Sequence, residues 1–248
     1  PGHASLTYMK TFFETVFKHA PRNALVEFSV GGVLPSNRVY KTVDEVLQDP
    51  GAYNGFAQTY FGPATRRERI PAGTKDNFKG SSVAWVDFDH ADRPLHILPE
   101  SVAVRSGNGW HLYWVLNEHT ERLDRLEAVN KALEMLLMKA NEAFDATRIL
   151  RVPNTINTKG GTRRPCELVE IHPERVYSLR TLYLSAYIKG ALRDLILTGD
   201  VEKFDGDRSD RDWYIIKRLV DLGFEDLDIE TIFQYNANLC QPVADGVG

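Results

Sequence analysis

Two aspartates, Asp87 and Asp89, stand at the end of the apolar run SVAWVDFD. Residues two apart along a strand point to the same face, so both carboxylates are expected on one side of a sheet, about 7 Å apart. Like charges at this separation repel each other unless a cation lies between them, and all-oxygen ligation favours Mg²⁺ or Mn²⁺. A strand end at which two aspartates simply meet water is the alternative explanation.

The segment SGNGWH, about twenty residues further on, has residue types that suit a phosphate group. Its glycines let the backbone approach a ligand closely, and its serine hydroxyl and backbone amides can donate to phosphate oxygens. A histidine on the following strand can also donate to a phosphate or orient a nucleotide. A hairpin turn with a packed histidine is the alternative. The predicted nucleotide-binding turn comprises Ser106, Gly107, Asn108, Gly109 and His111.

A third carboxylate, Asp145, opens the segment DATRILRVPNTINTKGGTRR. A two-metal phosphoryl-transfer site needs at least one carboxylate beyond an aspartate pair to hold both ions, and Asp145 is the best candidate. An ordinary turn aspartate would have the same spacing. The segment also carries a local positive patch and amides that can bond phosphates and sugars.

Positive charge has to be local in this chain, because 30 lysines and arginines are outnumbered by 34 aspartates and glutamates. A polyanion partner must therefore be met by a basic patch. One such patch lies in TRRERIPAGTKDNFKG and a second follows Asp145. The predicted nucleic-acid contacts are Arg66, Arg67, Lys75, Arg148, Arg163 and Arg164.

The elements that must position these groups are visible as hydrophobic patterns. Aromatic residues at helical spacing predict a core-facing helix from Tyr8 to His19. The run ALVEFSV follows, and Thr42 with Glu45 forms a capping-box pattern for a second, short helix. Residues 51–80 are rich in turn formers and basic groups, which indicates loops.

The strands SVAWVDFD and GWHLYWVL are predicted from their β-branched and aromatic content. Apolar residues recur every three or four positions from Glu121 to Phe144, which predicts an amphipathic helix of about six turns. That helix delivers the chain to Asp145, and CELVEIH is a further strand. We predict an α+β (α/β) body over residues 1–178, in which residues 1–5 are a tag remnant.

From Ser178 onward only helices are predicted, with Ser209 and Asp228 as N-caps of two of them. Residues 179–248 are therefore expected to form a small helical domain. A chain of 248 residues with 43% hydrophobic residues can bury one substantial core and a satellite domain. Its glycine-ending terminus suggests that it is cut from a longer protein.

Two further properties bear on location. The two cysteines, Cys166 and Cys240, lie far apart and lack zinc-site spacing, which favours a reducing compartment. The sequence has no apolar run near the roughly 20 residues of a membrane span and no signal-peptide pattern. We expect a soluble, cytoplasmic protein without a membrane partner.

The stretches WVDFDH, SGNGWHLYW and FDATRILRVPNTINTK, in this order and spacing, resemble the catalytic motifs of the archaeo-eukaryotic primase superfamily. The likeness is greatest to the primase-polymerases of plasmids, phages and mobile elements, and it covers about residues 80–172. It implies an RRM-like mixed or antiparallel sheet flanked by helices. The later stretch GDRSDRDWYIIKRLVDLGF is similar to the small helical module that follows the catalytic core in such proteins.

The resemblance also implies roles for residues. It makes Asp87, Asp89 and Asp145 the ligands of two Mg²⁺ or Mn²⁺ ions. Ser106 and His111 would contact the triphosphate of the incoming dNTP or NTP, and Arg151, Asn157 and Lys159 match the family's nucleotide-binding segment less strictly. The implied partners are a single-stranded DNA template with its primer and, in a longer protein, a helicase domain.

The expected function is therefore template-dependent nucleotide addition to a 3′-hydroxyl in DNA replication. Trp110, Tyr113 and Trp114 are candidate surfaces on which template bases stack. Two alternatives stay open. A phosphatase of the haloacid dehalogenase type also begins with DxD after an apolar strand, although the SGNGWH turn has no role there. A replication-initiator module would keep the fold and bind DNA without catalysis.

Overall fold

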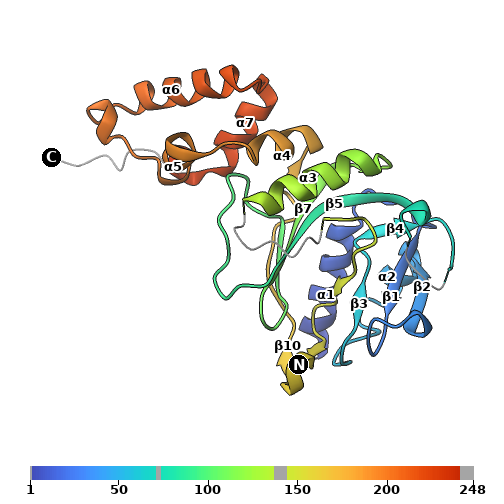
Figure 1. Cartoon of the computed structure of the whole chain (residues 1–248). Coiled ribbons are helices and arrows are strands. Elements are labelled where there is room, and N and C mark those ends of the chain that lie inside the picture. The colour runs from blue at the N-terminus through green and yellow to red at the C-terminus, as the bar shows by residue number, and fades with distance from the viewer. Residues whose placement is uncertain (1, 71–73, 137–143, 241–248) are drawn as a thin grey trace. The chain divides into compact units, whose positions relative to one another are not determined.

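The computed structural model describes residues 2–70, 74–136 and 144–240 (Figure 1). Their contacts divide the chain into two compact units. The sheet unit comprises residues 1–94 and 100–179, and the helical unit comprises residues 95–99 and 180–248. The later boundary thus lies one residue from the one expected from the sequence, while residues 95–99 group with the helices.

The sheet unit is built on a ten-stranded sheet in the order β11-β6-β7-β5-β4-β1-β3-β8, with β12 beside β7 and β2 beside β1. The pairings among these described strands are antiparallel except for β12 with β7. The strands are β1 (Leu25–Ser29), β2 (Arg38–Thr42), β3 (Tyr60–Phe61), β4 (Ala64–Arg66), β5 (Phe78–Phe88), β6 (Val102–Arg105), β7 (Trp110–Thr120), β8 (Leu150–Arg151), β11 (Glu167–Ile171) and β12 (Val176–Tyr177). A separate pair consists of β9 (Ile156–Asn157) and β10 (Arg164–Pro165).

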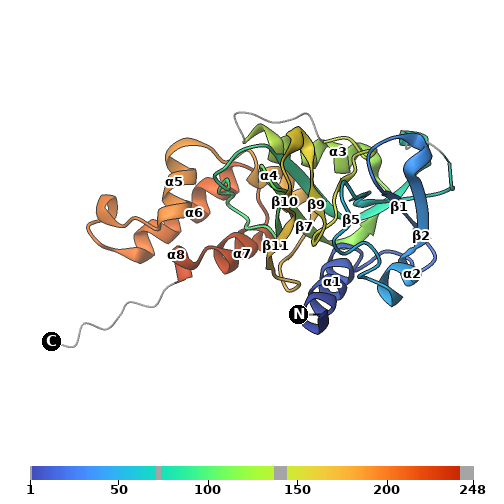
Figure 2. The same cartoon turned by 90° about the horizontal axis from the view of Figure 1, so that it is seen from below.

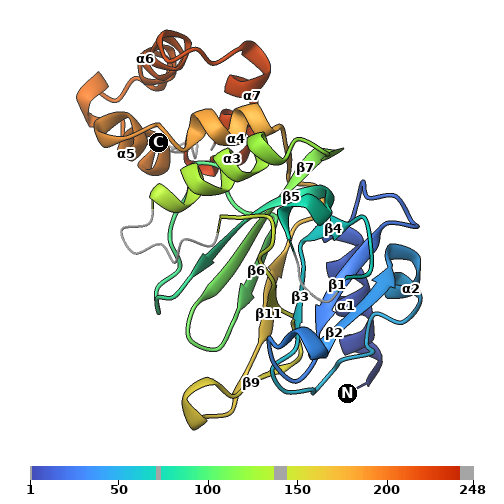
Figure 3. The same ribbon diagram turned by 45° about the vertical axis from the view of Figure 1, so that its right-hand side comes forward.

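The centre of the sheet is the pair β5 and β7, whose apolar residues are buried on both faces (Figure 3). Trp85 opposes Tyr113 in the register, and both side chains are fully buried. Helix α1 (Gly2–Val16) packs on this face, with the Phe12 ring 6.0 Å from that of Tyr113. Helix α3 (Leu123–Met135) contacts β5, which runs between α1 and α3 in Figures 1 and 2. The α+β class with a helix-flanked antiparallel sheet is confirmed.

Several predicted boundaries differ from the structure. Helix α1 begins at Gly2, inside the segment expected to be a tag remnant, rather than at Tyr8. Helix α2 (Val43–Gln48) has the predicted capping box of Thr42 and Glu45. Helix α3 ends at Met135, and residues 137–143 of its expected range lie outside the described residues.

The prediction that residues 51–80 are loops was wrong in part. They contain β3, β4, the first residues of β5 and the short 3₁₀ helix η2 (Lys75–Asn77). Strand β6 was also not predicted. Strands of two to four residues are too short to show an alternating pattern, and pairing with neighbouring strands defines them instead.

The helical unit contains most of α4 (Leu179–Ser185), then α5 (Gly190–Thr198), α6 (Arg208–Asp221), α7 (Asp226–Tyr235) and α8 (Ala237–Cys240). The two predicted caps lie two and three residues beyond the caps in the structure. Asp207, rather than Ser209, caps α6, because its carboxylate accepts from the amides of Ser209 and Asp210. Glu225 caps α7, and Asp228 is the third residue of its capping box.

In the described part of the chain, none of the helices combines the length and apolar character needed to span a membrane.

Candidate active site

A pocket of about 470 Å³ opens on the sheet unit and collects seven of the residues predicted to form the site. They are Asp87, Asp89, His111, Asp145, Arg148, Arg151 and Lys159. The carboxylates come from the end of β5 and from the loop before β8, while the cations follow Asp145 along the chain. The pocket therefore has acidic and basic groups on one lining, as a bound polyphosphate with metal ions requires.

Asp87 and His111 face each other because β5 and β7 pair in a register that places them opposite. The Asp87 Oδ1 lies 3.5 Å from His111 Nε2, and its Oδ2 lies 3.4 Å from Arg148 Nη2. Burial raises the pKa of Asp87, Arg148 opposes that shift, and the charge of Asp89 adds to it. Asp87 is thus a desolvated carboxylate beside a second carboxylate.

His111 is neutral at physiological pH. Burial, together with the positive charge of Arg151, lowers its pKa to about 3. Its Nδ1 is buried and has no hydrogen-bond partner among the described residues. The side chain therefore offers a neutral imidazole to the pocket rather than a permanent cation.

Gly109 brings the SGNGWH turn against the end of the acidic strand. A Cβ at this position would lie 2.1 Å from the Phe88 carbonyl oxygen and 2.8 Å from the Asp89 Cα. Both are backbone atoms, which cannot turn aside as a side chain can. Only glycine therefore allows the turn to lie this close to Asp89.

Gly109→Ala is expected to reduce activity at the pocket by one to two orders of magnitude, because the end of β5 must move and carry Asp89 with it. Overpacking should also lower the free energy of unfolding by about 1–3 kcal/mol. Urea unfolding and steady-state kinetics measure the two effects. Gly160→Ala is the comparison variant, because a Cβ at Gly160 meets nothing within 4 Å and the substitution adds only the backbone strain of a left-handed φ (+74°). Equal loss in both variants would contradict the close-approach argument.

The turn at Asp145 is held by hydrogen bonds with Thr147, Glu127 and the buried Arg66. Asp145 Oδ1 accepts from the Thr147 amide at 2.9 Å and from the Thr147 hydroxyl. The next residue, Ala146, donates its amide to Glu127 on α3 at 2.9 Å. Its carbonyl accepts from Arg66 at 2.7 Å. Both backbone groups of Ala146 are thus fixed, which fixes the direction of Asp145.

Asn130 links this turn to the acidic strand. Its Oδ1 accepts from the Trp85 amide of β5 at 3.0 Å, and its Nδ2 donates to the Phe144 carbonyl at 3.2 Å. The residue is fully buried on α3. One side chain therefore ties the strand of Asp87 to the segment of Asp145.

The prediction that Arg66 contacts nucleic acid is wrong. Arg66 lies in β4 with 1% of its surface exposed, and it pairs with Glu27 at 2.8 Å. A run of basic residues in the sequence does not show which of their side chains points into the core. Lys75 and Arg67 remain exposed but do not line the pocket: Lys75 pairs with Glu127 at 2.7 Å, and Arg67 donates to the Phe78 carbonyl.

The remainder of the SGNGWH turn lies beside the pocket rather than in its lining. The Ser106 amide donates to the Gly109 carbonyl at 2.9 Å, and Asn157 Nδ2 donates to the Ser106 carbonyl at 2.9 Å. The Asn157 Oδ1 accepts from the Lys159 amide. Asn157 therefore braces the turn and orients Lys159, and the roles of Ser106 and Asn157 as nucleotide ligands stay predictions.

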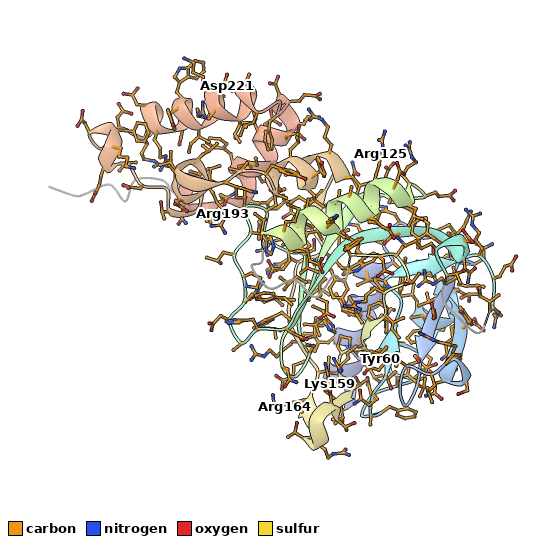
Figure 4. All side chains as sticks on the ribbon, viewed as in Figure 1. Tyr60, Arg125, Lys159, Arg164, Arg193 and Asp221 are labelled. Carbon is orange, nitrogen blue, oxygen red and sulfur yellow. The ribbon has the colours of Figure 1, made fainter. Side chains whose placement is uncertain are left out.

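The tip of the turn is joined to the β9–β10 hairpin. Gly107 has a left-handed φ of +99°, and a Cβ there would lie 2.8 Å from Asn157 Nδ2. Asn108 accepts a hydrogen bond from Arg164, and both residues are exposed. Arg163 is also exposed. These residues lie outside the pocket lining, and Figure 4 shows Arg164 on the hairpin near Lys159.

The predicted stacking surfaces are not available to bases. Tyr113 and Trp114 are fully buried, and Trp110 is 9% exposed. The guanidinium groups of Arg93 and Arg105 lie over the Trp110 ring at 5.7 and 4.9 Å. These aromatic residues form the core of the sheet instead.

Sequence reasoning missed Arg38 and Tyr60, which also line the pocket. Tyr60 in β3 pairs with Arg151 in β8, whose guanidinium lies 5.1 Å from the centre of the Tyr60 ring (Figure 4). Arg38 in β2 forms an ion pair of 2.8 Å with Glu27. Neither has a motif around it, and Tyr60 reaches the site through pairing with a strand far away in sequence.

The side chains of the pocket lining have the chemistry predicted for metal ligands, but their positions do not form a complete metal site. Asp87, Asp89 and Asp145 supply the oxygen donors that hard divalent ions prefer. However, across residues 2–70, 74–136 and 144–240, no three histidine, cysteine, aspartate or glutamate side chains converge as a metal site. Asp145 directs one oxygen to Thr147 instead.

Comparison with known proteins gives no match to a family model and no match to a curated protein. The AEP domain (PP-N190) of the cyanophage S-2L primase-polymerase is similar in structure, with a TM-score of 0.52 and 12% sequence identity over 73% of this chain and 97% of that chain. Primase RepB′ is similar with a TM-score of 0.43 and 13% identity over 91% of this chain and 86% of that one. The catalytic domain of RepB′, solved in complex with initiator DNA, is similar with a TM-score of 0.47 and 12% sequence identity over 72% of this chain and 93% of that one. The chain thus has the AEP fold of the phage primase-polymerase domain.

Proposed function

We propose that this protein is a template-dependent nucleotidyltransferase, a DNA primase or polymerase that adds nucleotides to a 3′-hydroxyl on a single-stranded DNA template. One observation carries the proposal: on an AEP fold, three carboxylates and four cationic side chains line a single pocket. A nucleoside triphosphate needs both kinds of group, because its charge must be neutralised while its phosphates are held in line.

Asp87, Asp89 and Asp145 are the residues that would hold two Mg²⁺ or Mn²⁺ ions. Bound there, the ions would lower the pKa of the attacking hydroxyl and neutralise the leaving pyrophosphate. The raised pKa of Asp87 supports this role, since a buried carboxylate beside Asp89 gains most from a cation between them.

The opposite contribution comes from Arg148, Arg151 and Lys159, whose positive charges face the space for the triphosphate. The two arginines are held in place, Arg148 by Asp87 and Arg151 by Tyr60. Preorganised cations stabilise the charge that develops on the phosphoryl oxygens without rearranging during the reaction. His111 adds a neutral donor next to them.

Primer extension with labelled nucleotides tests the proposal. We expect extension of a primer on a single-stranded template with Mg²⁺ or Mn²⁺, and none after EDTA. Repeating the reaction without primer separates priming from extension, and comparing dNTPs with NTPs identifies the substrate. Release of phosphate from a simple monoester without extension would favour the phosphatase, and DNA binding without either reaction would favour the initiator module.

His111→Ala is expected to raise the KM for the nucleotide about tenfold while template affinity stays within twofold. Steady-state kinetics and anisotropy of a labelled oligonucleotide measure the two quantities. Equal losses in both would contradict a role at the triphosphate.

The same variant changes the acid stability of the protein. Folded His111 takes up a proton only near pH 3, whereas the unfolded chain takes it up near the ordinary value of 6.5. The unfolded state therefore binds more protons between these values, and this residue lowers the free energy of unfolding as the pH falls from 6.5. His111→Ala should lose less stability over that window in urea titrations.

A further inference from the structure

Beside the catalytic pocket lies a second hollow of about 400 Å³, which we call the side hollow. Its lining consists of Pro35, Ser36, Arg38, Tyr40, Arg69 and Ile70. Arg38 lines both the pocket and the side hollow. The two spaces are therefore neighbours that share one guanidinium as part of their walls.

The turn between β1 and β2 borders both spaces with an apolar tip. Val33 lines the pocket and Pro35 lines the side hollow. Leu34 lies between them in sequence and is 63% exposed, while Val33 is 58% exposed. Adjacent exposed apolar residues at a hairpin tip suit contact with an apolar ligand surface.

Hydrogen bonds hold the residues that line the side hollow in place. The Tyr40 hydroxyl donates to the Ile70 carbonyl at 2.7 Å, and Arg69 donates to the Tyr40 carbonyl at 3.0 Å. These bonds join the segment after β4 to β2. Arg69 is held beside the hollow while it remains exposed.

The charge around Arg38 favours an anion. Glu27 lies between Arg38 and Arg66, with N–O distances of 2.8 Å on both sides. One carboxylate between two guanidinium groups leaves a net positive charge, and Arg38 is the member that reaches both spaces. Arg69 adds a second positive charge on the far wall of the side hollow. Salt screens the electric field of the partly buried Arg38 less than it screens the field of an exposed charge.

We propose that the side hollow binds the single-stranded template where it passes the pocket, with backbone phosphates on Arg38 and Arg69 and a base against Leu34. The inference rests on the proposed function and names the path of its template. Proteins hold single strands with a positively charged groove and side chains that contact the base faces, and Leu34 offers an aliphatic surface for that contact. A protein partner would need a larger apolar face than this tip offers.

Matched substitutions separate the two kinds of contact. Arg69→Gln removes one charge, and its control is Arg125→Gln, an exposed arginine on α3 that is labelled away from Lys159 in Figure 4. Leu34→Ser removes the apolar contact, and its control is Val169→Ser, a 47% exposed residue on β11. The probe is a labelled single-stranded oligonucleotide, titrated by anisotropy at several salt concentrations, with nucleotide KM measured in parallel.

Arg69→Gln should weaken oligonucleotide binding about fivefold and reduce the dependence of log Kd on log salt by about 0.7, the value for one phosphate of a single strand. Leu34→Ser should weaken binding about tenfold without changing that slope. Nucleotide KM should change less than twofold in both, and the controls should bind like the wild type.

Equal weakening by Arg69→Gln and Arg125→Gln would overturn the inference, because it would show only general charge attraction. Unchanged oligonucleotide binding in Leu34→Ser would overturn the base contact. If the wild type extends primers and all four variants bind template normally, the inference fails while the proposed function stands. If the wild type binds the oligonucleotide through these residues but extends no primer, the proposed function fails and the side hollow remains a strand-binding surface.

Discussion

Asp87→Asn should reduce primer extension about a thousandfold or more while making the protein without divalent ions more stable. The loss follows from removing a charge that lies against His111, Arg148 and the neighbouring Asp89 at the centre of the pocket. Extension rates at saturating nucleotide measure it.

The gain in stability has a definite sign. Burial raises the pKa of folded Asp87, so the folded state binds its proton more tightly than the unfolded state does. Charging the carboxylate above that pKa therefore costs stability, and asparagine avoids the cost at neutral pH. The control is Asp124→Asn, an exposed aspartate at the start of α3, which should leave extension unchanged and slightly lower the stability, because the charge favours the N-terminus of the helix. Extension by Asp87→Asn at the wild-type rate would remove the basis of the proposed function.

Glu27→Gln should lower the free energy of unfolding by about 3–5 kcal/mol, because it leaves two arginines without their shared carboxylate. Arg66 is fully buried, so water cannot replace the lost partner. Chemical unfolding measures the change. The comparison variant is Glu121→Gln, which breaks the exposed pair with Lys79 and should leave the unfolding midpoint almost unchanged.

Measuring kcat in the same variant separates unfolding of the protein from displacement of the Asp145 turn. Arg66 also donates to the Ala146 carbonyl, beside Asp145. At a temperature where Glu27→Gln is still folded, its kcat for extension should fall while circular dichroism stays native. Adding Arg66→Met to Glu27→Gln should recover part of the stability but not the kcat, since the double variant still lacks the bond to Ala146. Recovery of both would mean that the network serves stability alone.

The acidic pair and the histidine were predictable because strand alternation and register follow from apolar patterning. Asp87 was expected on one face of a long strand and His111 on a face of the next, and antiparallel pairing then sets them opposite each other. Asp145 was found through its own chemistry and through its place after a long amphipathic helix. Its support by Asn130 and Glu127 was not predictable, because both are ordinary polar residues within that helix.

The site residues that the sequence misplaced or did not reveal lie on short strands. Arg66 looked like a surface cation because three charged residues follow it directly, yet a three-residue strand turns it into the core against Glu27. Tyr60 was missed because its two-residue strand reaches the site through pairing with β8, far away in sequence, and Arg38 was missed because no motif surrounds it. Short strands carry little local signal, so tertiary contacts decide them.

The pocket draws its lining from chain positions as far apart as Val33 and Lys159. The lining is assembled by long-range pairing, such as that of Tyr60 in β3 with Arg151 in β8. Loop closure of this kind is slow and comes with the late, nonlocal steps of folding, whereas helices form early. The pocket lining is thus complete only after strands far apart in the chain have paired, so a partly folded chain lacks the site.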